Sequence, residues 1–166
     1  MIEYFDNVFS IDKNIEIHEQ LHKPRWRFDG GGTSDDGQTT SHFWHVNNLE
    51  NDEYFINLFD EISPTFFSNQ EVSIVRCYAN GQSAGQTGLP HTDDGDVTLL
   101  YFPTVWKHYY GGHLNFCDDN NITSVIEYKQ NRMVKFDAKL KHYSNAPINA
   151  YTGLRLSLAF KVRIHE

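Results

Sequence analysis

Cysteine, long apolar runs and basic charge are all scarce in this sequence, and each shortage excludes a class of protein. Only two cysteines occur, Cys77 and Cys117. Such sparse thiols fit neither a disulfide framework nor a zinc knuckle, so we expect both to be reduced and in or near the core. The longest apolar runs, such as residues 99–103, are far shorter than the roughly 20 residues that span a bilayer. Residues 1–10 alternate acids with aromatics, unlike a signal peptide. We therefore expect a cytoplasmic protein without a membrane segment.

The excess of acidic charge argues against nucleic acid as a partner. The 166 residues include 14 lysines and arginines against 22 aspartates and glutamates, which gives a net charge of -8. Phosphate backbones are bound mainly by lysine and arginine, so this balance disfavours binding to nucleic acid. Hydrophobic residues make up 39% of the chain and aromatic residues 14%, which is enough to build a packed core. Because neither a repeat nor a linker divides the chain, residues 1–166 are expected to form a single domain.

The first 65 residues favour helices and loops that cover another layer of the fold. Asp12 is a candidate cap for a helix that ends near residue 22. Asn47 and Glu50 resemble a capping pair for a second helix, which Pro64 is expected to end. The glycine-rich segment 29–41 between them carries no phosphate-loop motif, so it is either a lid over a groove or a disordered loop.

From residue 66 the pattern changes to short strands separated by turn signals. Asn80-Gly81, Asp94-Gly95 and Gly111-Gly112 are the turn or bulge candidates. The expected strands cover residues 72–78, 89–93, 97–102, 113–116, 123–128, 133–136 and 154–164. So many strands in a short stretch predict a sandwich or jelly roll, and hence a mainly β protein of the α+β class with N-terminal helices.

The last of these strands has the cleanest alternation. Every second residue from Leu154 to Ile164 is large and apolar, which assigns that face to a core. The opposite face carries the smaller or polar side chains Arg155, Ser157, Ala159, Lys161 and Arg163.

The segment His91-Thr92-Asp93 is the strongest chemical signal. On a strand, residues two apart point the same way, so His91 and Asp93 can bind one metal ion, or simply pair with each other. His142, just after an apolar strand, is the leading candidate for a third ligand. Two histidines and one carboxylate leave positions open for other ligands, an arrangement typical of non-haem Fe(II) oxygenases.

Arg155 follows His142 by thirteen residues and lies on the polar face of the last strand. If that face is enclosed, the guanidinium needs an anion, and arginine suits bidentate binding of a carboxylate. Ser157 on the same face can add a hydroxyl. A buried cation behind an open metal site predicts a dicarboxylate cosubstrate, although an internal acid such as Glu127 is an alternative partner.

Several segments, taken in order, resemble the Fe(II)- and 2-oxoglutarate-dependent dioxygenases, and among them the prolyl 4-hydroxylase-like group. The resemblance covers roughly residues 72–162. It rests on the strand that ends in Tyr78, on His91-Thr92-Asp93, on the strand 97–102, on Gly111-Gly112-His113-Leu114, on residues 131–137 leading to His142, and on residues 155–160.

The resemblance implies a double-stranded β-helix, the jelly-roll or cupin-like fold, with residues 66–166 as the catalytic core and helices packed on the larger sheet. It implies Fe(II), 2-oxoglutarate and O2 as cofactor and cosubstrates, with ascorbate as reductant. By resemblance, His91, Asp93 and His142 hold iron, Arg155 pairs with the distal carboxylate of 2-oxoglutarate, and Tyr78 lines its pocket, to which Ser157 contributes.

Two features depart from the pattern of that group. The spacing from His142 to Arg155 is longer than usual, so Lys161 is a second candidate for the cosubstrate anchor. Phe102 stands where some relatives carry tyrosine.

The resemblance implies hydroxylation of a prolyl or other residue in a peptide or protein, with decarboxylation of 2-oxoglutarate to succinate and CO2. Hydroxylation of a free amino acid or small metabolite is the alternative, and a non-catalytic jelly-roll binding module is the alternative of another class. His42, His45, His108 and His113 fit exposed or loop positions better than ligand positions. The aromatic residues that form either a substrate groove or ordinary core are Trp26, Phe28, Trp44, Trp106, Tyr109 and Tyr110.

Overall fold

The computed structural model describes residues 1–30, 32, 34–39, 42–68, 70–119 and 121–165. Its α-helices are α1 (Ile11–Leu21) and α2 (Glu53–Phe67), and its short 3-10 helices are η1 (Leu49–Asn51) and η2 (His108–Tyr110). Its strands are β1 (Ile2–Asp6), β2 (Arg27–Gly30), β3 (Phe43–Val46), β4 (Glu71–Gln82), β5 (Val97–Phe102), β6 (Leu114–Cys117), β7 (Ile122–Ile126), β8 (Arg132–Asp137), β9 (His142–Ser144) and β10 (Arg155–His165).

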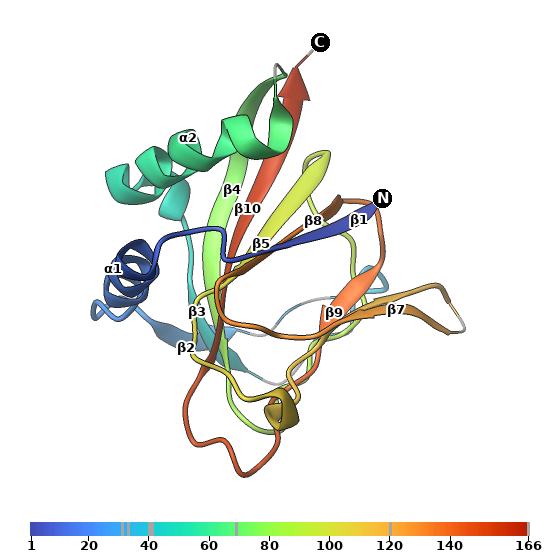
Figure 1. The fold of residues 1–166 in the computed structure, drawn as a ribbon. Helices are drawn as coiled ribbons and strands as arrows, with labels where there is room; N and C mark the ends of the chain where they lie inside the picture. Colours follow the sequence, from blue (N-terminus) through green and yellow to red (C-terminus); the bar gives the residue numbers. More distant parts are fainter. Residues whose placement is uncertain (31, 33, 40–41, 69, 120, 166) are drawn as a thin grey trace.

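The strands form two antiparallel sheets, and the helices lie on the larger one. The larger sheet has seven strands in the order β1-β8-β5-β10-β4-β3-β2, and the smaller has three in the order β7-β6-β9. An isolated antiparallel β-bridge also pairs His91 with His142, the first residue of β9. Figure 1 shows α1 and α2 on the side of the larger sheet that faces away from β7 and β9. The predicted mainly β fold with N-terminal helices is therefore confirmed at this level.

Two apolar clusters hold these layers together, and β10 contributes to both. Leu156, Leu158 and Phe160 belong to the cluster that joins the larger sheet to α1 and α2. Ala159 belongs to the second cluster, which includes Phe116 of the smaller sheet. The predicted alternation along this strand is thus confirmed. Its polar face is enclosed on the side of the smaller sheet, where an unpaired charge would be costly.

Both helices begin at caps other than those predicted. Ser10 caps α1, and its hydroxyl accepts a hydrogen bond from the Lys13 amide at 3.2 Å. Asp52 caps α2, and its carboxylate accepts from the Tyr54 amide at 3.0 Å. Several polar residues stand near each helix start, and the sequence pattern does not show at which of them the first helical turn begins. Pro64 does not end α2 but lies in its last turn.

The carbonyl of Pro64 accepts the closing hydrogen bond of α2 from the Ser68 amide. A proline can therefore take part in a final helical turn through its acceptor, although it lacks a donor.

The strand predictions were right for most of the C-terminal part and wrong in three places. Residues 89–93 form no strand; only His91 pairs, in the isolated bridge. The Asn80-Gly81 pair is no turn, because β4 runs through it to Gln82. The short strands β1, β2, β3 and β9 were missed, since three to five residues carry too little periodicity to register.

The cysteine and membrane expectations can also be compared with the structure. Both cysteines are free thiols; Cys77 is buried, and burial raises its pKa, whereas Cys117 is partly exposed. Among the described residues, no helix is long and apolar enough to cross a membrane.

The predicted turn at Asp94-Gly95 is present and tightly packed. Gly95 has φ +79, and a Cβ placed there would lie 2.6 Å from the Val162 carbonyl oxygen of β10. This turn carries the chain from Asp93 into β5, so its shape sets the direction of the preceding segment.

We expect Gly95→Ala to lower the free energy of unfolding by about 2–4 kcal/mol, because the left-handed conformation and a backbone clash both penalise a side chain. Gly85→Ala is the matched control, since Gly85 has φ +84 and a Cβ placed there would meet nothing within 4 Å. It should cost about 1 kcal/mol. Urea unfolding of the two variants measures the difference, and equal losses would show that the contact with Val162 is unimportant.

Candidate metal centre

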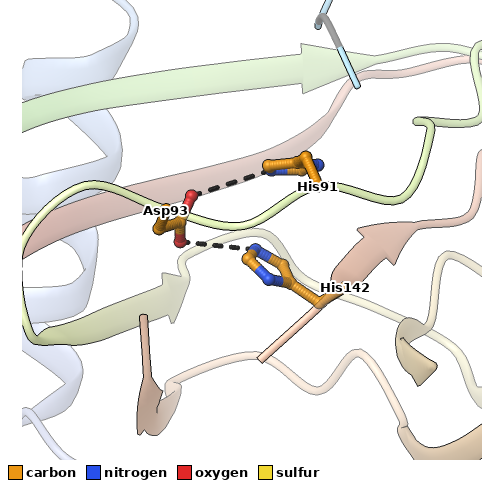
Figure 2. A group of neighbouring side chains, drawn as sticks. All are labelled: His91, Asp93 and His142. Carbon is orange, nitrogen blue, oxygen red and sulfur yellow. Dashed lines mark ion pairs between the residues drawn. The ribbon is translucent and has the colours of Figure 1, made fainter. Parts of the chain in front are cut away.

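Three side chains from two distant parts of the chain meet at one point between the sheets. His91 and Asp93 come from the segment before β5, and His142 is the first residue of β9. Their ligand atoms all lie within 4.8 Å of one another. His91 Nε2 is 3.7 Å from Asp93 Oδ1, and His142 Nε2 is 3.3 Å from Asp93 Oδ2, as drawn in Figure 2. The structure therefore brings together the three residues that the sequence singled out.

Hydrogen bonds orient both imidazole rings. His91 Nδ1 lies 2.8 Å from the Leu89 carbonyl oxygen, and His142 Nδ1 lies 2.8 Å from the Leu140 carbonyl oxygen. A carbonyl can only accept, so each Nδ1 donates a proton to it, and each Nε2 is the ring nitrogen turned toward Asp93. Burial lowers the pKa of His91, and the nearby His142 lowers it further. The neutral form that binds a metal ion is thereby favoured.

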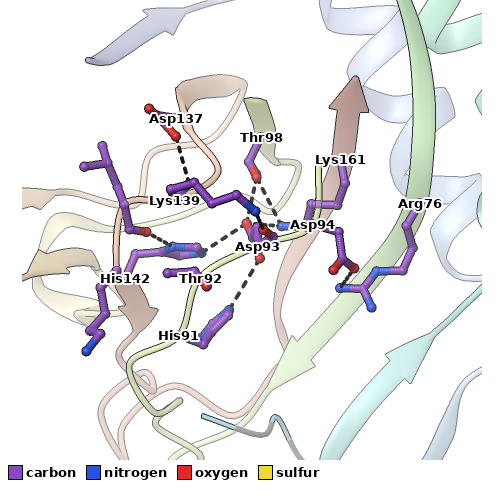
Figure 3. Close-up of polar contacts among 12 residues, drawn as sticks. Arg76, His91, Thr92, Asp93, Asp94, Thr98, Asp137, Lys139, His142 and Lys161 are labelled. Atoms are coloured by element: carbon purple, nitrogen blue, oxygen red, sulfur yellow. Dashed lines mark hydrogen bonds and ion pairs between the residues drawn. The ribbon is translucent and has the colours of Figure 1, made fainter. Parts of the chain in front are cut away.

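Asp93 is buried, and two further donors hold its carboxylate. The Thr98 hydroxyl donates to Asp93 Oδ2 at 2.7 Å, and the Lys161 ammonium donates to the same oxygen. Figure 3 shows these contacts converging on Asp93 from β5 and β10. Burial opposes the charge of Asp93, but Lys161 and His142 outweigh it and lower the pKa of the carboxyl. Asp93 is therefore an anion poised to bind a cation.

The donor set suits a divalent transition metal. Two imidazole nitrogens and one carboxylate oxygen, with no sulfur, match the ligands of non-haem iron and differ from the closed, sulfur-rich sets of structural zinc. Within the described part of the chain this is the one group of three or more such ligands that approach one another so closely.

A cavity of about 460 Å³ opens beside the metal centre, within the usual range for small-molecule sites. His91 and Asp93 line it, and so do the predicted pocket residues Tyr78 and Ser157. Gln82 forms another part of the wall.

Arg155 lies behind this wall and is fully buried. Its Nε donates to the Gly112 carbonyl oxygen at 2.7 Å, and its Nη1 donates to Gln82 Oε1 at 3.1 Å. Its Nη2 is buried and has no hydrogen-bond partner among the described residues. Burial lowers the pKa of Arg155 to about 10, so it remains charged at neutral pH. An unpaired buried donor on a cation fits an anionic ligand.

No carboxylate in the described residues pairs with Arg155. The alternative partner Glu127 is exposed, whereas the Arg155 guanidinium is fully buried. Lys161, in contrast, already has an anion in Asp93. The aromatic rings of Phe102 and Tyr128 lie 5.4 and 4.9 Å from the Arg155 guanidinium, so the cation rests among π faces.

Sequence reasoning missed several residues of the cavity wall. Phe43, His45, Asn47 and Asn80 also line it, and His45 Nε2 lies 3.2 Å from Asp29 Oδ1. Most of them lie on or just after β3, which brings them beside β4. A strand of four residues offers no pattern from which this placement could be read.

The six aromatic residues proposed for a groove do not line this cavity. Trp26 packs against the helix-side core and donates to the Leu21 carbonyl oxygen. Phe28 and Trp44 contact each other, with ring centroids 5.1 Å apart. Trp106, Tyr109 and Tyr110 form a separate aromatic group near η2. The groove interpretation was therefore wrong for this cavity.

Part of the glycine-rich segment reaches the metal centre. The Asp35 carboxylate accepts hydrogen bonds from the Thr92 amide at 3.0 Å and from the Thr92 hydroxyl at 3.2 Å. Residues 31, 33, 40 and 41 of the predicted lid or disordered loop lie outside the described residues.

Comparison with known proteins gives a structural likeness without a sequence match. No protein-family model and no curated protein matches the sequence. An oxidoreductase of the 2OG-Fe(II) oxygenase family from Burkholderia pseudomallei has a TM-score of 0.77 at 14% identity, with 99% of this chain and 86% of that chain covered. A prolyl hydroxylase from Trichoplax adhaerens, in complex with a hypoxia inducible factor peptide fragment, has a TM-score of 0.70 at 13% identity, covering 98% and 82%.

The epimerase SnoN from nogalamycin biosynthesis, in complex with Fe3+, alpha ketoglutarate and nogalamycin RO, has a TM-score of 0.69 at 10% identity, covering 98% and 78%. At such identities the likeness concerns the fold. At that level the predicted resemblance to 2-oxoglutarate and Fe(II) oxygenases, prolyl hydroxylases among them, is confirmed.

We expect the protein to bind one Mn(II) ion per chain at neutral pH under anaerobic conditions. His142→Ala removes a ligand and should weaken this binding by at least about 100-fold, more than the typical effect of changing an outer-shell residue. Isothermal titration calorimetry measures both affinities.

The matched control for this test is His108→Ala, which removes an exposed histidine outside the cluster and should leave Mn(II) affinity unchanged. Equal affinities for the parent protein and His142→Ala would remove His142 from the ligand set.

Proposed function

We propose that this protein is a non-haem Fe(II)- and 2-oxoglutarate-dependent dioxygenase. The observation that carries the proposal is the meeting of His91, Asp93 and His142 beside a cavity whose wall is backed by the unpaired guanidinium of Arg155. A metal ion with open positions and a buried cation within one site suit a cosubstrate that chelates through one end and carries a carboxylate at the other. The fold likeness to oxygenases of this kind supports the same conclusion.

The proposed architecture is a double-stranded β-helix of the jelly-roll or cupin-like type in one domain over residues 1–166. Residues 66–166 form its catalytic core, and residues 1–65 supply the helical and loop cover together with the short edge strands. The two facing antiparallel sheets and the enclosed polar face of β10 support this assignment.

Each residue has a stated role in this proposal. His91, Asp93 and His142 hold Fe(II), and when bound the iron with 2-oxoglutarate and O2 supplies the oxidising chemistry, which yields succinate and CO2. Arg155 pairs with the distal carboxylate of 2-oxoglutarate, and Gln82 orients the guanidinium through Nη1. Tyr78 and Ser157 line the space between the two ends of the cosubstrate.

Arg155 is a better candidate than Lys161 for the cosubstrate anchor. The Lys161 ammonium is engaged with Asp93 Oδ2 and lies 3.4 Å from the Thr98 hydroxyl. Arg155 retains a donor with no partner in the described part of the chain, and a carboxylate would satisfy it.

The proposed reaction is hydroxylation of a prolyl or other residue in a peptide or protein. The cavity wall includes the side-chain amides of Asn47 and Asn80 and the hydroxyl of Ser157, which make no hydrogen bond to the described residues. An amide both donates and accepts, so such groups suit the backbone of a bound peptide. A free amino acid or small metabolite is the alternative substrate. The fold likeness to an epimerase that was solved with nogalamycin RO supports this alternative.

The test is succinate formation by the purified protein with Fe(II), 2-oxoglutarate, O2 and ascorbate, with and without proline-containing peptides. We expect the parent protein to form succinate and peptides to accelerate it. His91→Ala and Asp93→Ala should fall to the level of a protein-free blank, because each removes a metal ligand.

His108→Ala is the control for these variants and should keep full activity, while circular dichroism checks that all variants fold. A parent protein that neither binds Fe(II) anaerobically nor forms succinate would favour the non-catalytic jelly-roll binding module. Acceleration by free amino acids but not by peptides would favour the small-molecule alternative.

Arg155→Leu should raise the 2-oxoglutarate concentration required for half-maximal succinate formation by about 10–100-fold, the loss expected for a hydrogen bond to a charged group. Mn(II) affinity should stay close to that of the parent, because Arg155 contacts none of the three ligands in the described structure. An unchanged 2-oxoglutarate requirement would show that a cation other than Arg155 binds the distal carboxylate.

A further inference from the structure

Lys161 is a fully buried cation beside the metal centre, and the proposed reaction gives it no role. Its side chain is 1% exposed, and it lies on β10 directly opposite Thr98 of β5. The ammonium contacts Asp93 Oδ2 and lies 5.1 Å from the centre of the Tyr78 ring. Burial opposes this charge, but the neighbouring Tyr78 and Asp93 raise the pKa of Lys161. Asp93 is the anion that pairs with the ammonium.

The two oxygens of Asp93 have different surroundings. Oδ2 accepts from Lys161 and from the Thr98 hydroxyl, which uses the lone pairs of that oxygen. Oδ2 also lies 3.3 Å from His142 Nε2, whereas Oδ1 accepts no hydrogen bond from the described residues and lies 3.7 Å from His91 Nε2. Figure 3 shows Lys161 and Thr98 on the side of Asp93 away from His91. The carboxylate therefore has one oxygen held by Lys161 and Thr98 and one that faces His91.

We propose that Lys161 is a positioning residue for the metal ligand Asp93, with two consequences for the proposed iron site on which this inference rests. Together with Thr98, it holds Oδ2 so that Asp93 offers only Oδ1 to the metal ion. In the metal-free protein its ammonium supplies the positive charge that the buried carboxylate needs.

A cation in this position stabilises the apoprotein but weakens the binding of the metal ion. Removing either partner of a buried ion pair leaves an uncompensated charge, so the apoprotein depends on Lys161. Once the metal is bound, the ammonium shares the charge of Asp93 and repels the dication, which weakens binding. Lys161 thus lowers the metal affinity of the site and stabilises the folded apoprotein.

Lys161→Met keeps most of the side-chain volume and removes the charge. We expect its metal-free melting temperature to fall by roughly 6 °C or more, the result of leaving Asp93 unpaired. We expect Mn(II) to bind about tenfold more tightly than to the parent, which corresponds to about 1.4 kcal/mol of relieved repulsion. The rise in melting temperature on adding saturating Mn(II) should therefore be larger in the variant than in the parent.

Lys161→Gln is the second variant, because an amide can still donate to Asp93 Oδ2 without carrying charge. It should fold even if the methionine variant does not, and it should also bind Mn(II) more tightly than the parent. Lys135→Met is the matched control: Lys135 donates to the Phe66 carbonyl oxygen and touches no metal ligand. It should lower melting temperature equally with and without Mn(II).

Differential scanning fluorimetry measures the melting temperatures, and anaerobic titration calorimetry measures the Mn(II) affinities. Tighter Mn(II) binding and a larger metal-induced shift in the folded Lys161 variants support the proposal. The opposite outcome is unchanged or weaker Mn(II) binding by the Lys161 variants, with melting temperatures that fall equally with and without Mn(II), as expected for Lys135→Met. Lys161 would then have only a packing role, and the proposal would be overturned. If the parent still forms succinate in that case, the proposed function stands; a parent that binds no Mn(II) would overturn both.

Discussion

The compensation of one buried carboxylate governs the centre of this molecule. Asp93 lies between the sheets at 6% exposure, where a lone anion would be strongly unfavourable. Lys161, Thr98 and the two histidines surround it from β5, β9, β10 and the segment before β5. Because these elements are far apart in the sequence, the carboxylate ties them to one point. The same contacts that make the burial tolerable keep the carboxylate beside both histidines, with Oδ1 3.7 Å from His91 Nε2 and Oδ2 3.3 Å from His142 Nε2.

Strand β10 joins this polar centre to the rest of the fold. One face carries large apolar side chains into the helix-side core, so the strand is anchored by burial. The other face presents Arg155, Ser157 and Lys161 toward the smaller sheet. Arg155 and Lys161 thus share one face of one strand, but their partners differ: Lys161 has Asp93, and Arg155 has a donor that no described residue accepts from. That difference separates a structural cation from one suited to an external anion.

Much of the C-terminal half was predictable because strong local signals coincide there. Residues 97–102 were predicted as a strand and form β5 without any change of bounds. The alternation of β10 and the turn at Gly95 were also predictable, since periodicity and glycine conformation are local properties. The capping of α2 by Asp52 and the short strands β1, β2, β3 and β9 were not, because neighbouring sequence positions compete for such roles and tertiary pairing selects among them.

The sequence by itself determined which chemistry was available: a His-x-Asp segment, a later histidine and a polar strand face that carries Arg155 and Lys161. The sequence did not determine how these side chains are arranged in space. His91 and Asp93 were expected side by side on a strand, yet they belong to an irregular segment placed by one bridge to His142 and by the Gly95 turn. Which cation would pair with Asp93, and which would remain open, was likewise decided by the tertiary structure. The physical reason is that side-chain pairing depends on distances between strands, and those distances exist only after the two sheets have packed.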